Sequence, residues 1–562
     1  MVPRIELTPQ TVQSGSANQP FERKRGQLKI KPTAEAGKVQ HTLRLGGGKN
    51  VKAKFGERHQ TKLGGAPLLL QLELHQQLVY GAARCLRDSR LPSQIKYSLY
   101  QLLWQRVLLI CCGYEDVIDG TLLAHDPGLQ LALLVNEGGE ATGPASQPTG
   151  CRFENKMSAA NCYRLAAWLV FAYIARKKRP PKAIRLDFDG SCVPTYGQQQ
   201  GSSFRSYYDT DMFFPLFVFD EDGELITAVL RAGENGEAKL TLPVLRRLVA
   251  AFRSEWPGVK ITAVMDAGFN DPKIYDWCED QGKTNSVDTV YYLIKLKNAG
   301  GAGSGLTSKS KELAKLCKES FGSRFGAARY FVRKLKGKKK ATKTKTEVEK
   351  HIRQIHDKKE RKKAWQEYSS RVTRRYGEFE HRTGKGGKDK KQWRCDRRVL
   401  VECTDDDWGS RCTFWVTNIV GDTPAHLIND VYSRRGNAEL RIKDAKAFRC
   451  DKLSCQNFVA NQFRLLMHVL AQRLMFAFRS LLPATAQTMT LATVRERFIC
   501  IPAIVEEKVR ETALIWSSTF PLKNHMHALC ARLTSAQKHI RDWFSKYSQF
   551  TKPLIIKAFQ AA

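Results

Sequence analysis

The chain has 562 residues, 42% of them hydrophobic, which is enough for about three or four folded domains and excludes a disordered basic tail protein. Lys and Arg number 92 against 55 Asp and Glu, so the net charge is +37 at neutral pH. This excess predicts a polyanionic partner, and at this length nucleic acid is favoured over a membrane surface.

Cysteine usage and hydropathy indicate the cytoplasm. The 15 cysteines are odd in number and irregularly spaced, which argues against a secreted disulfide framework. The N-terminal stretch MVPRIELTPQ has no apolar signal core, and the most apolar runs are too short or too interrupted by polar residues to cross a membrane. We therefore expect a cytoplasmic protein with no membrane partner.

The first 180 residues divide into an arm and a helical domain. Residues 1–64 are rich in Gly, Lys and polar side chains, as in GGGKNVKAKFGERHQTKLGG, and predict a flexible basic arm. From PLLLQLELHQQLVYGAARCL onward the apolar spacing is helical, and IKYSLYQLLWQRVLLICCGYEDV continues it. Residues 65–180 are thus a predicted helical domain for DNA binding or dimerisation.

Alternating patterns follow over residues 181–299. PKAIRLDFDGS predicts a strand with Asp187 and Asp189 on one face and apolar residues on the other. MFFPLFVFDEDGELITAVLRAG predicts two strands joined at its Asp-Gly pair. AKLTLPVLRRLVAAFRSEW is an expected helix, and VKITAVMDAGF is a strand ending at Asp266, followed by the strand TVYYLIKLKN. The order predicts a mixed α/β layout.

Residues 300–420 interrupt this layout with a basic insertion. Positions 331–400 hold 26 Lys and Arg against 9 Asp and Glu, a net charge of +17, with aromatic residues interleaved. Such a mixture suits phosphate contact and base stacking, although the Lys-rich run also fits a solvated insertion. RRVLVECTDD and RCTFWVTNI then predict a strand pair, and a helical region is expected over 484–562.

One acid stands among cations in DVYSRRGNAELRIKDAK, within the expected segment 421–483. On a helix, Tyr432, Arg435, Glu439 and Lys446 would fall within an arc of about 80°. A surface helix with ordinary ion pairs is the simpler interpretation of an isolated stretch of this kind.

Three acids are prominent by their positions, namely Asp189 and Asp266 at strand ends and Glu439 on a later helix. Converged carboxylates need cations, and oxygen ligands suit Mg²⁺, two ions of which can act in phosphoryl transfer. Taken singly, a strand-end aspartate is more often a turn former than a ligand.

Several motifs carry a resemblance to a known family. Tyr432, Arg435, Glu439 and Lys446 reproduce a Tyr-x2-Arg-x3-Glu-x6-Lys spacing that resembles the signature of bacterial insertion-sequence transposases with an Asp-Asp-Glu triad, DDE group 1. GYEDVIDG, SQPTGCRFEN, LDFDGSCVPTYGQQQ, VMDAGF and DKLSCQNFVANQFRLLMHVLAQRL look like the insertion sequence 1380 family, over about residues 64–483.

The resemblance implies an RNase H-like core, in parts 181–299 and 421–483, interrupted by the insertion domain. It implies a catalytic, metal-binding triad of Asp189, Asp266 and Glu439. Asp187, on the same strand face as Asp189, is a rival for the first position.

The resemblance also assigns DNA-end contacts to Tyr432, Arg435 and Lys446, with which we group Arg434 and Lys443. Trp415 in TFWVTN is a candidate for stacking on an unpaired base, although a strand tryptophan is usually a core residue.

We accordingly expect a cut-and-paste DNA transposase associated with the bacterial nucleoid. It would bind the terminal inverted repeats as a homodimer and join the 3′ ends to target DNA with two Mg²⁺ ions, for which Mn²⁺ substitutes. No small-molecule substrate is expected. The alternatives are a metal-dependent nuclease without strand transfer and a non-catalytic DNA-binding protein derived from a transposase.

Overall fold

The structure is a computed structural model with two compact units, Met1–His59 and Gln60–Ala562. It describes residues 40–44, 50–54, 59–133, 143–177, 179–282, 288–296, 352–370, 373–382, 393–406, 409–507 and 511–535. In the first unit, β1 (Gln40–Arg44) and β2 (Asn50–Lys54) form an antiparallel hairpin. This hairpin lies in the expected flexible arm, so composition alone missed secondary structure there.

The largest element of the second unit is an eight-stranded sheet with the order β12-β13-β14-β11-β10-β4-β8-β9. Its strands are β4 (Ala183–Gly190), β8 (Leu216–Phe219), β9 (Leu225–Val229), β10 (Lys260–Met265), β11 (Val290–Lys295), β12 (Thr373–His381), β13 (Arg397–Asp406) and β14 (Gly409–Thr417). β10 is parallel to both β4 and β11, and the other neighbours are antiparallel.

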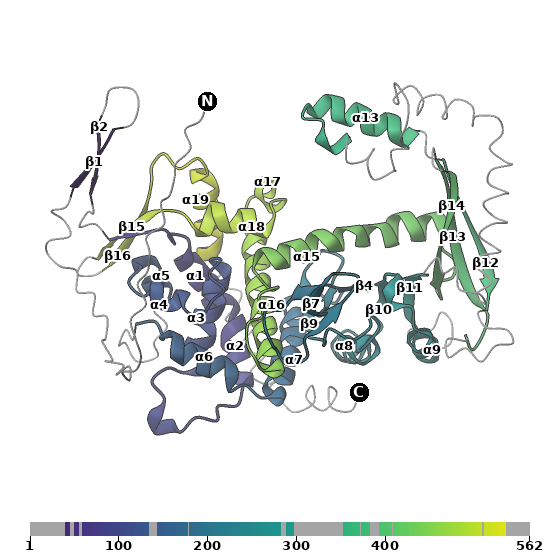
Figure 1. Cartoon of the computed structure of the whole chain (residues 1–562), viewed down its shortest axis with the longest axis horizontal. Coiled ribbons are helices and arrows are strands. Elements are labelled where there is room, and N and C mark those ends of the chain that lie inside the picture. Colours follow the sequence, from purple (N-terminus) through teal and green to yellow (C-terminus); the bar gives the residue numbers. More distant parts are fainter. Residues whose placement is uncertain are drawn as a thin grey trace, which may run out of the picture. The chain divides into compact units, whose positions relative to one another are not determined.

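Helices cover one face of this sheet. Apolar residues of β4, β10 and β11 pack there against α7 (Ala159–Arg176), α8 (Thr241–Glu255) and α9 (Pro272–Asp280). The other face of β4 carries Asp187 and Asp189, as its alternating sequence predicted, and α15 (Ala438–Ala447) lies on that side (Figure 1). The sheet thus has an apolar face and a face with carboxylates.

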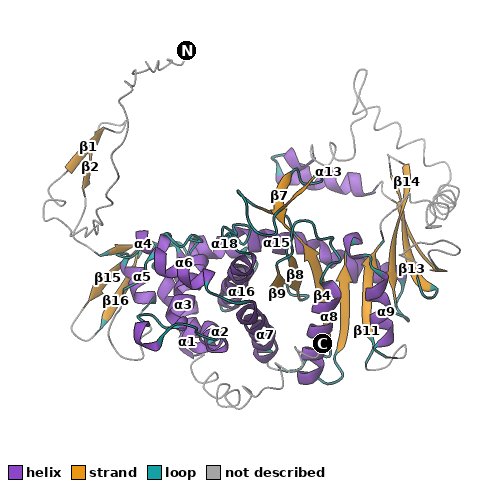
Figure 2. Cartoon of the chain, turned by 60° about the horizontal axis from the view of Figure 1, so that its bottom comes forward, coloured by secondary structure: helices purple, strands orange, loops and turns teal. Residues whose placement is uncertain are grey.

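A helical assembly packs around α16 (Phe458–Ser480), which is buried along most of its length and contacts α3, α7 and β9 (Figure 2). Within the part of the chain that the structure describes, the other α-helices of the protein are α1 (Ala66–Gln76), α2 (Leu78–Cys85), α3 (Leu99–Cys111), α4 (Asp119–Leu122), α5 (Pro127–Ala132), α6 (Gln147–Asn155), α13 (Lys358–Ser370), α14 (Pro424–His426), α17 (Ala484–Gln487), α18 (Leu491–Val494) and α19 (Lys523–Ser535). Within the described ranges, no helix is both long and apolar enough to span a membrane.

The C-terminal region is not purely helical, contrary to the expectation. β15 (Ala503–Glu507) and β16 (Thr512–Trp516) form a hairpin, and β3 (Gln60–Thr61) pairs with β15. Short β-rich segments such as AIVEE and TALIW carry little periodic signal, and the partner strand is distant in sequence. A second small sheet joins β5 (Val193–Pro194), β7 (Thr210–Phe213) and β6 (Ser203–Arg205).

The described part of the insertion extends the main sheet. β13 and β14 form the expected strand pair, and β14 pairs with β11. Trp393 is buried against Tyr275, and Phe379 packs on Phe414. Trp393 belongs to the core of the sheet and Phe379 packs partly buried against it, so the prediction that the interleaved aromatics stack on bases is wrong for Trp393. The Lys-rich run lies outside the described residues.

Buried ion pairs connect α3, α6 and α16. Glu154 lies 2.7 Å from Nε of Arg106 and 3.7 Å from Nε of Arg464, and each of the three side chains is at most 3% exposed. Both arginines also donate to the backbone carbonyl of Glu115. The motifs GYEDVIDG and SQPTGCRFEN and the α16 sequence therefore meet in one polar cluster.

Glu154→Ala should lower the free energy of unfolding by about 3 to 5 kcal/mol, because two buried guanidinium groups lose their carboxylate. Urea denaturation measures this, with exposed Glu496→Ala as a control expected to change stability by less than about 0.5 kcal/mol. Equal midpoints for the two variants would contradict a stabilising cluster.

Candidate active site

The ends of two parallel strands bring Asp189 and Asp266 together. Strand β10 pairs Met265 with Phe188 of β4, so the residues that follow these two lie side by side. Asp266 accepts a hydrogen bond from the Gly268 amide at 2.8 Å, which begins the short helix η2 (Ala267–Phe269). The aspartate side chains are 13% and 36% exposed, respectively, so both are accessible to a ligand.

One guanidinium group neutralises both carboxylates. A terminal nitrogen of Arg435 lies 3.1 Å from Oδ1 of Asp189 and 3.5 Å from Oδ2 of Asp266, and it also donates to the Phe188 carbonyl at 3.3 Å. Burial disfavours the charged guanidinium, but the two aspartates outweigh burial and raise the pKa of Arg435. The two carboxylates therefore converge on one point that requires positive charge.

Asp187 has different partners from Asp189. Its fully buried carboxylate accepts hydrogen bonds from Arg185, at 3.0 and 3.1 Å, and from Arg441, at 2.8 Å. Burial raises the pKa of Asp187, while the two arginines oppose that shift. Both of its oxygens are thus occupied by side chains of the protein, which favours Asp189 as the first acid of the site.

Glu439 lies in the first turn of α15, and its side chain is outside what the structure describes. Two residues later, Arg441 donates to the backbone carbonyls of Asp220 and Glu221 as well as to Asp187. These bonds hold the start of α15 on the carboxylate face of the sheet. Among the described side chains, no group of three metal-ligating residues is assembled.

The segment before Glu439 is not the regular α-helix that its spacing predicted. Residues 427–432 form a π-helix, η4, and residues 433–437 form a 3-10 helix, η5. Gly436 and Asn437 are poor helix formers, and the Ser433 hydroxyl donates to the Ile428 carbonyl. The single helical face that was expected therefore exists only in part.

Some of the predicted DNA-contacting residues are held by contacts within the protein, and others are exposed. Lys446 donates to the Cys192 carbonyl at 3.0 Å, and Tyr432 is partly buried, which raises its pKa to about 12. Arg434 and Lys443 are exposed. Trp415 is 3% exposed, and its ring meets Tyr432 edge-on at 5.5 Å. The buried indole is what a core role requires, so base stacking stays a prediction that needs the ring to become exposed.

A nearby acid was missed by the sequence analysis. A Cβ built on Gly268 would lie 0.8 Å from a carboxylate oxygen of Glu237, so that carboxylate lies directly against the loop that carries Asp266. No periodic pattern could indicate this, because Glu237 belongs to the irregular stretch GENGE.

Residues 43–323 and 329–538 match the model of a family described as "Transposase DDE domain group 1". No curated protein matches the chain. Among solved structures, a cryo-EM piggyBac transposase synaptic complex with hairpin DNA is similar over 87% of both chains, with 9% identity and a TM-score of 0.35. The family match covers most of the chain, whereas a TM-score of 0.35 is too low to indicate a shared fold.

The variants Asp187→Asn and Asp189→Asn should show which of the two aspartates stabilises the fold and which binds metal. We expect Asp187→Asn to lower the free energy of unfolding by about 2 to 3 kcal/mol, because two arginines lose a buried carboxylate. Asp189→Asn should lower it by less than about 1 kcal/mol but abolish Mn²⁺ binding in calorimetric titrations. Loss of Mn²⁺ binding in Asp187→Asn alone would instead identify Asp187 as the ligand.

Proposed function

Because the chain belongs to the family described as transposase DDE domain group 1, we propose that it is a cut-and-paste DNA transposase. It cleaves DNA at the terminal inverted repeats of its element and joins the 3′ ends to target DNA. The observation that carries this proposal is the convergence of Asp189 and Asp266 at the ends of parallel strands, on a shared cationic partner.

The strand order supports an RNase H-like core. In the order β9-β8-β4-β10-β11, the first three strands are antiparallel and the last three are parallel, an arrangement typical of such a core. The core then consists of two sequence segments, with the insertion between β11 and the helix that carries Glu439. In such a core, the first and second acids would lie on adjacent strands and the third on the covering helix.

The donors fit divalent metal ions. Asp189, Asp266 and Glu439 would hold two Mg²⁺ ions, for which Mn²⁺ could substitute, since carboxylate oxygens are preferred ligands of both. The fit rests on two carboxylates that already share one cationic group. When bound, such ions activate a water molecule or hydroxyl nucleophile and stabilise charge on the phosphate.

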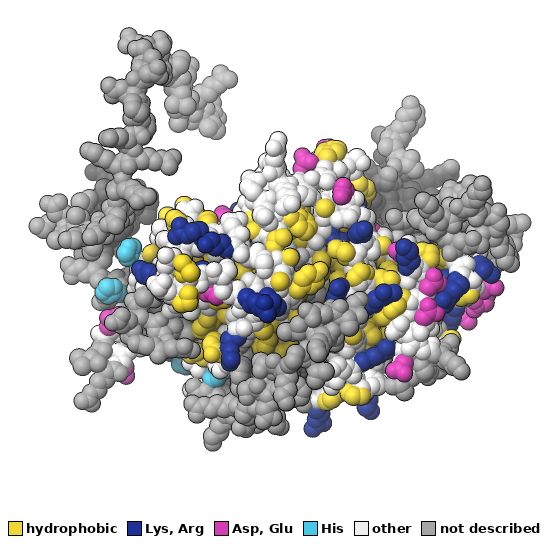
Figure 3. All heavy atoms as spheres, turned by 90° about the horizontal axis from the view of Figure 1, so that it is seen from below, with side chains coloured by type: hydrophobic (Ala, Val, Ile, Leu, Met, Phe, Trp, Pro, Cys, Tyr) yellow, Lys and Arg dark blue, Asp and Glu magenta, His cyan; other side chains and the backbone are white. Residues whose placement is uncertain are grey.

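The surrounding cations would hold DNA. Arg434 and Lys443 are exposed beside the site, and Lys446 would need only to exchange a backbone carbonyl for a phosphate. Arg435 would turn from the aspartates to the DNA end once their charge is neutralised. Tyr432, and Trp415 if exposed, would contact the terminal nucleotides. On the face shown in Figure 3, described cations lie in several separate groups.

We further propose that the chain is a bacterial insertion-sequence transposase of the 1380 type, acting in the cytoplasm at the nucleoid. The motifs GYEDVIDG and SQPTGCRFEN support this narrower assignment. Synapsis of two ends implies a homodimer on DNA, with the helical domain and the C-terminal region as candidates for end recognition or dimer contact. No small-molecule substrate is required.

The decisive experiment combines purified protein, Mg²⁺, labelled DNA with the flanks of the gene, and a target plasmid. Wild type should cut and join, whereas Asp189→Asn, Asp266→Asn and Glu439→Gln should bind DNA but lose at least about a thousandfold in rate. Exposed Glu506→Gln is the matched control and should behave as wild type. Cutting without joining would favour a nuclease, and binding without metal-dependent cutting would favour a non-catalytic DNA-binding protein.

Arg435→Gln should bind Mn²⁺ more tightly than wild type in the absence of DNA, by roughly threefold to tenfold, because the guanidinium no longer competes for the aspartates. The same variant should bind end DNA more weakly. Calorimetric titration with Mn²⁺ measures the first effect, and Arg434→Gln, an exposed neighbour, should leave Mn²⁺ affinity unchanged. Unchanged or weaker Mn²⁺ binding in Arg435→Gln would refute this competition.

A further inference from the structure

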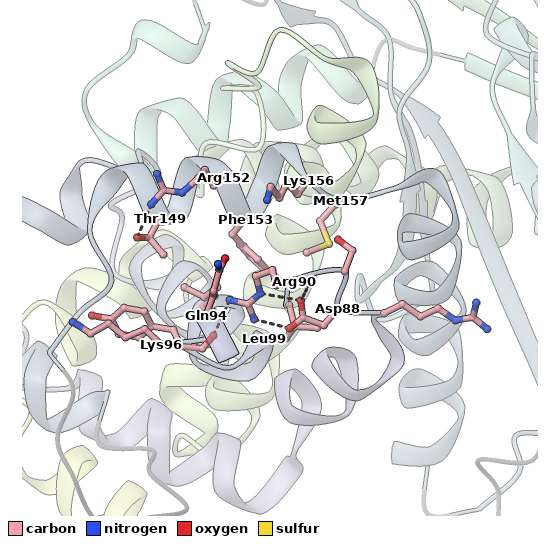
Figure 4. A pocket seen from close by; sticks show the side chains of 14 residues that line it. Asp88, Arg90, Gln94, Lys96, Leu99, Thr149, Arg152, Phe153, Lys156 and Met157 are labelled. Atoms are coloured by element: carbon pink, nitrogen blue, oxygen red, sulfur yellow. Dashed lines mark hydrogen bonds and ion pairs between the residues drawn. The ribbon is translucent and has the colours of Figure 1, made fainter. Parts of the chain in front are cut away.

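A cavity of about 250 Å³ lies in the helical assembly, outside the candidate active site. It is formed by the loop between α2 and α3 together with α6, and Figure 4 shows its lining side chains. Arg152 and Phe153 of the motif SQPTGCRFEN line it. The ion pairs of Glu154 account for the buried side of that motif. The proposed catalysis gives no role to its exposed side.

The charges around this cavity are strongly unbalanced. Five cations and one acid line it, a net charge of +4; they are Arg87, Arg90, Lys96, Arg152, Lys156 and Asp88. Both carboxylate oxygens of Asp88 accept hydrogen bonds from Arg90, at 2.8 and 2.7 Å. Within the described part of the chain, the other four cations form no ion pair. The cavity is therefore suited to an anionic ligand.

The loop that forms the cavity is held in place. Arg90 also donates to the Tyr97 carbonyl at 2.8 Å, which joins the two ends of the loop. Buried Asn161 of α7 accepts from the Arg87 amide at 3.0 Å and donates to the Arg87 carbonyl at 3.1 Å. A preformed site loses less conformational entropy when a ligand binds.

The lining combines these cations with an apolar floor. Leu102, Phe153 and Met157 are buried at its base, whereas Lys96, Arg152 and Lys156 are exposed at its rim. A ligand with phosphate groups and a flat base would satisfy both parts. A nucleotide unit of a DNA strand has this chemistry, and the net charge of +37 favours a polymeric anion over a free nucleotide.

We propose that this cavity binds an unpaired nucleotide and the adjoining phosphates of the DNA on which the protein acts. The inference rests on the proposed function, because it takes DNA as the substrate. It adds a second contact that holds a frayed or single-stranded segment while the acids act elsewhere on the same molecule. SQPTGCRFEN would then serve both as scaffold, through Glu154, and as DNA contact, through Arg152 and Phe153.

Fluorescence polarisation in EDTA tests whether the cavity binds single-stranded DNA. Two probes are used, a labelled single strand of twelve nucleotides and labelled ATP. The double variant Arg152→Ala and Lys156→Ala should weaken single-strand binding by roughly tenfold and reduce the slope of log K against log salt concentration by about 1 to 2. The control variant, Arg497→Ala with Lys523→Ala, removes two exposed cations that do not line the cavity, and should retain at least half of the wild-type affinity.

Unchanged affinity and salt slope in the cavity variant would overturn the proposal, as would loss of ATP binding with single-strand binding retained. Both cavity side chains are exposed, so thermal unfolding should match wild type. If wild type binds no DNA, this proposal and the transposase proposal both fail. If it binds DNA through the cavity but never cuts with Mg²⁺, only the transposase proposal fails.

Discussion

Repulsion between adjacent carboxylates is the constraint on which the candidate site depends. Parallel pairing of β4 and β10 places Asp189 beside Asp266. Two neighbouring negative charges repel each other unless a cation lies between them. Arg435 supplies that cation from a segment far along the chain. These ion pairs hold the segment before α15 against the ends of β4 and β10.

A second set of cations completes this attachment. Arg441 on α15 reaches Asp187 and two backbone carbonyls at the β8–β9 turn, while Arg185 pairs with Asp187 from the same strand. Because Asp187 is fully buried, it needs these partners to remain in the fold. Two aspartates on one strand face thus differ in environment: Asp187 is fully buried between two arginines, whereas Asp189 is partly exposed and shares Arg435 with Asp266.

Buried ion pairs also hold the helical assembly together, away from solvent. Glu154, Arg106 and Arg464 meet where three helices pack, and Arg473 of α16 pairs with Glu224 beside the sheet. Helix α16 therefore connects the N-terminal helices with the strands through buried charge as well as apolar contact. Removing either partner of such a pair would leave an uncompensated buried charge.

The sequence by itself determined the strands β4, β10, β11, β13 and β14, the main helices, and the candidates Asp189 and Asp266, because local periodicity and turn residues report those features directly. It did not distinguish Asp187 from Asp189, since alternation places both on one face. Only the tertiary structure decided that Asp187 is held by two arginines, that Glu237 lies against Gly268, and that β3 joins the C-terminal hairpin. These contacts join residues far apart in the chain, and no local pattern encodes which partners will meet.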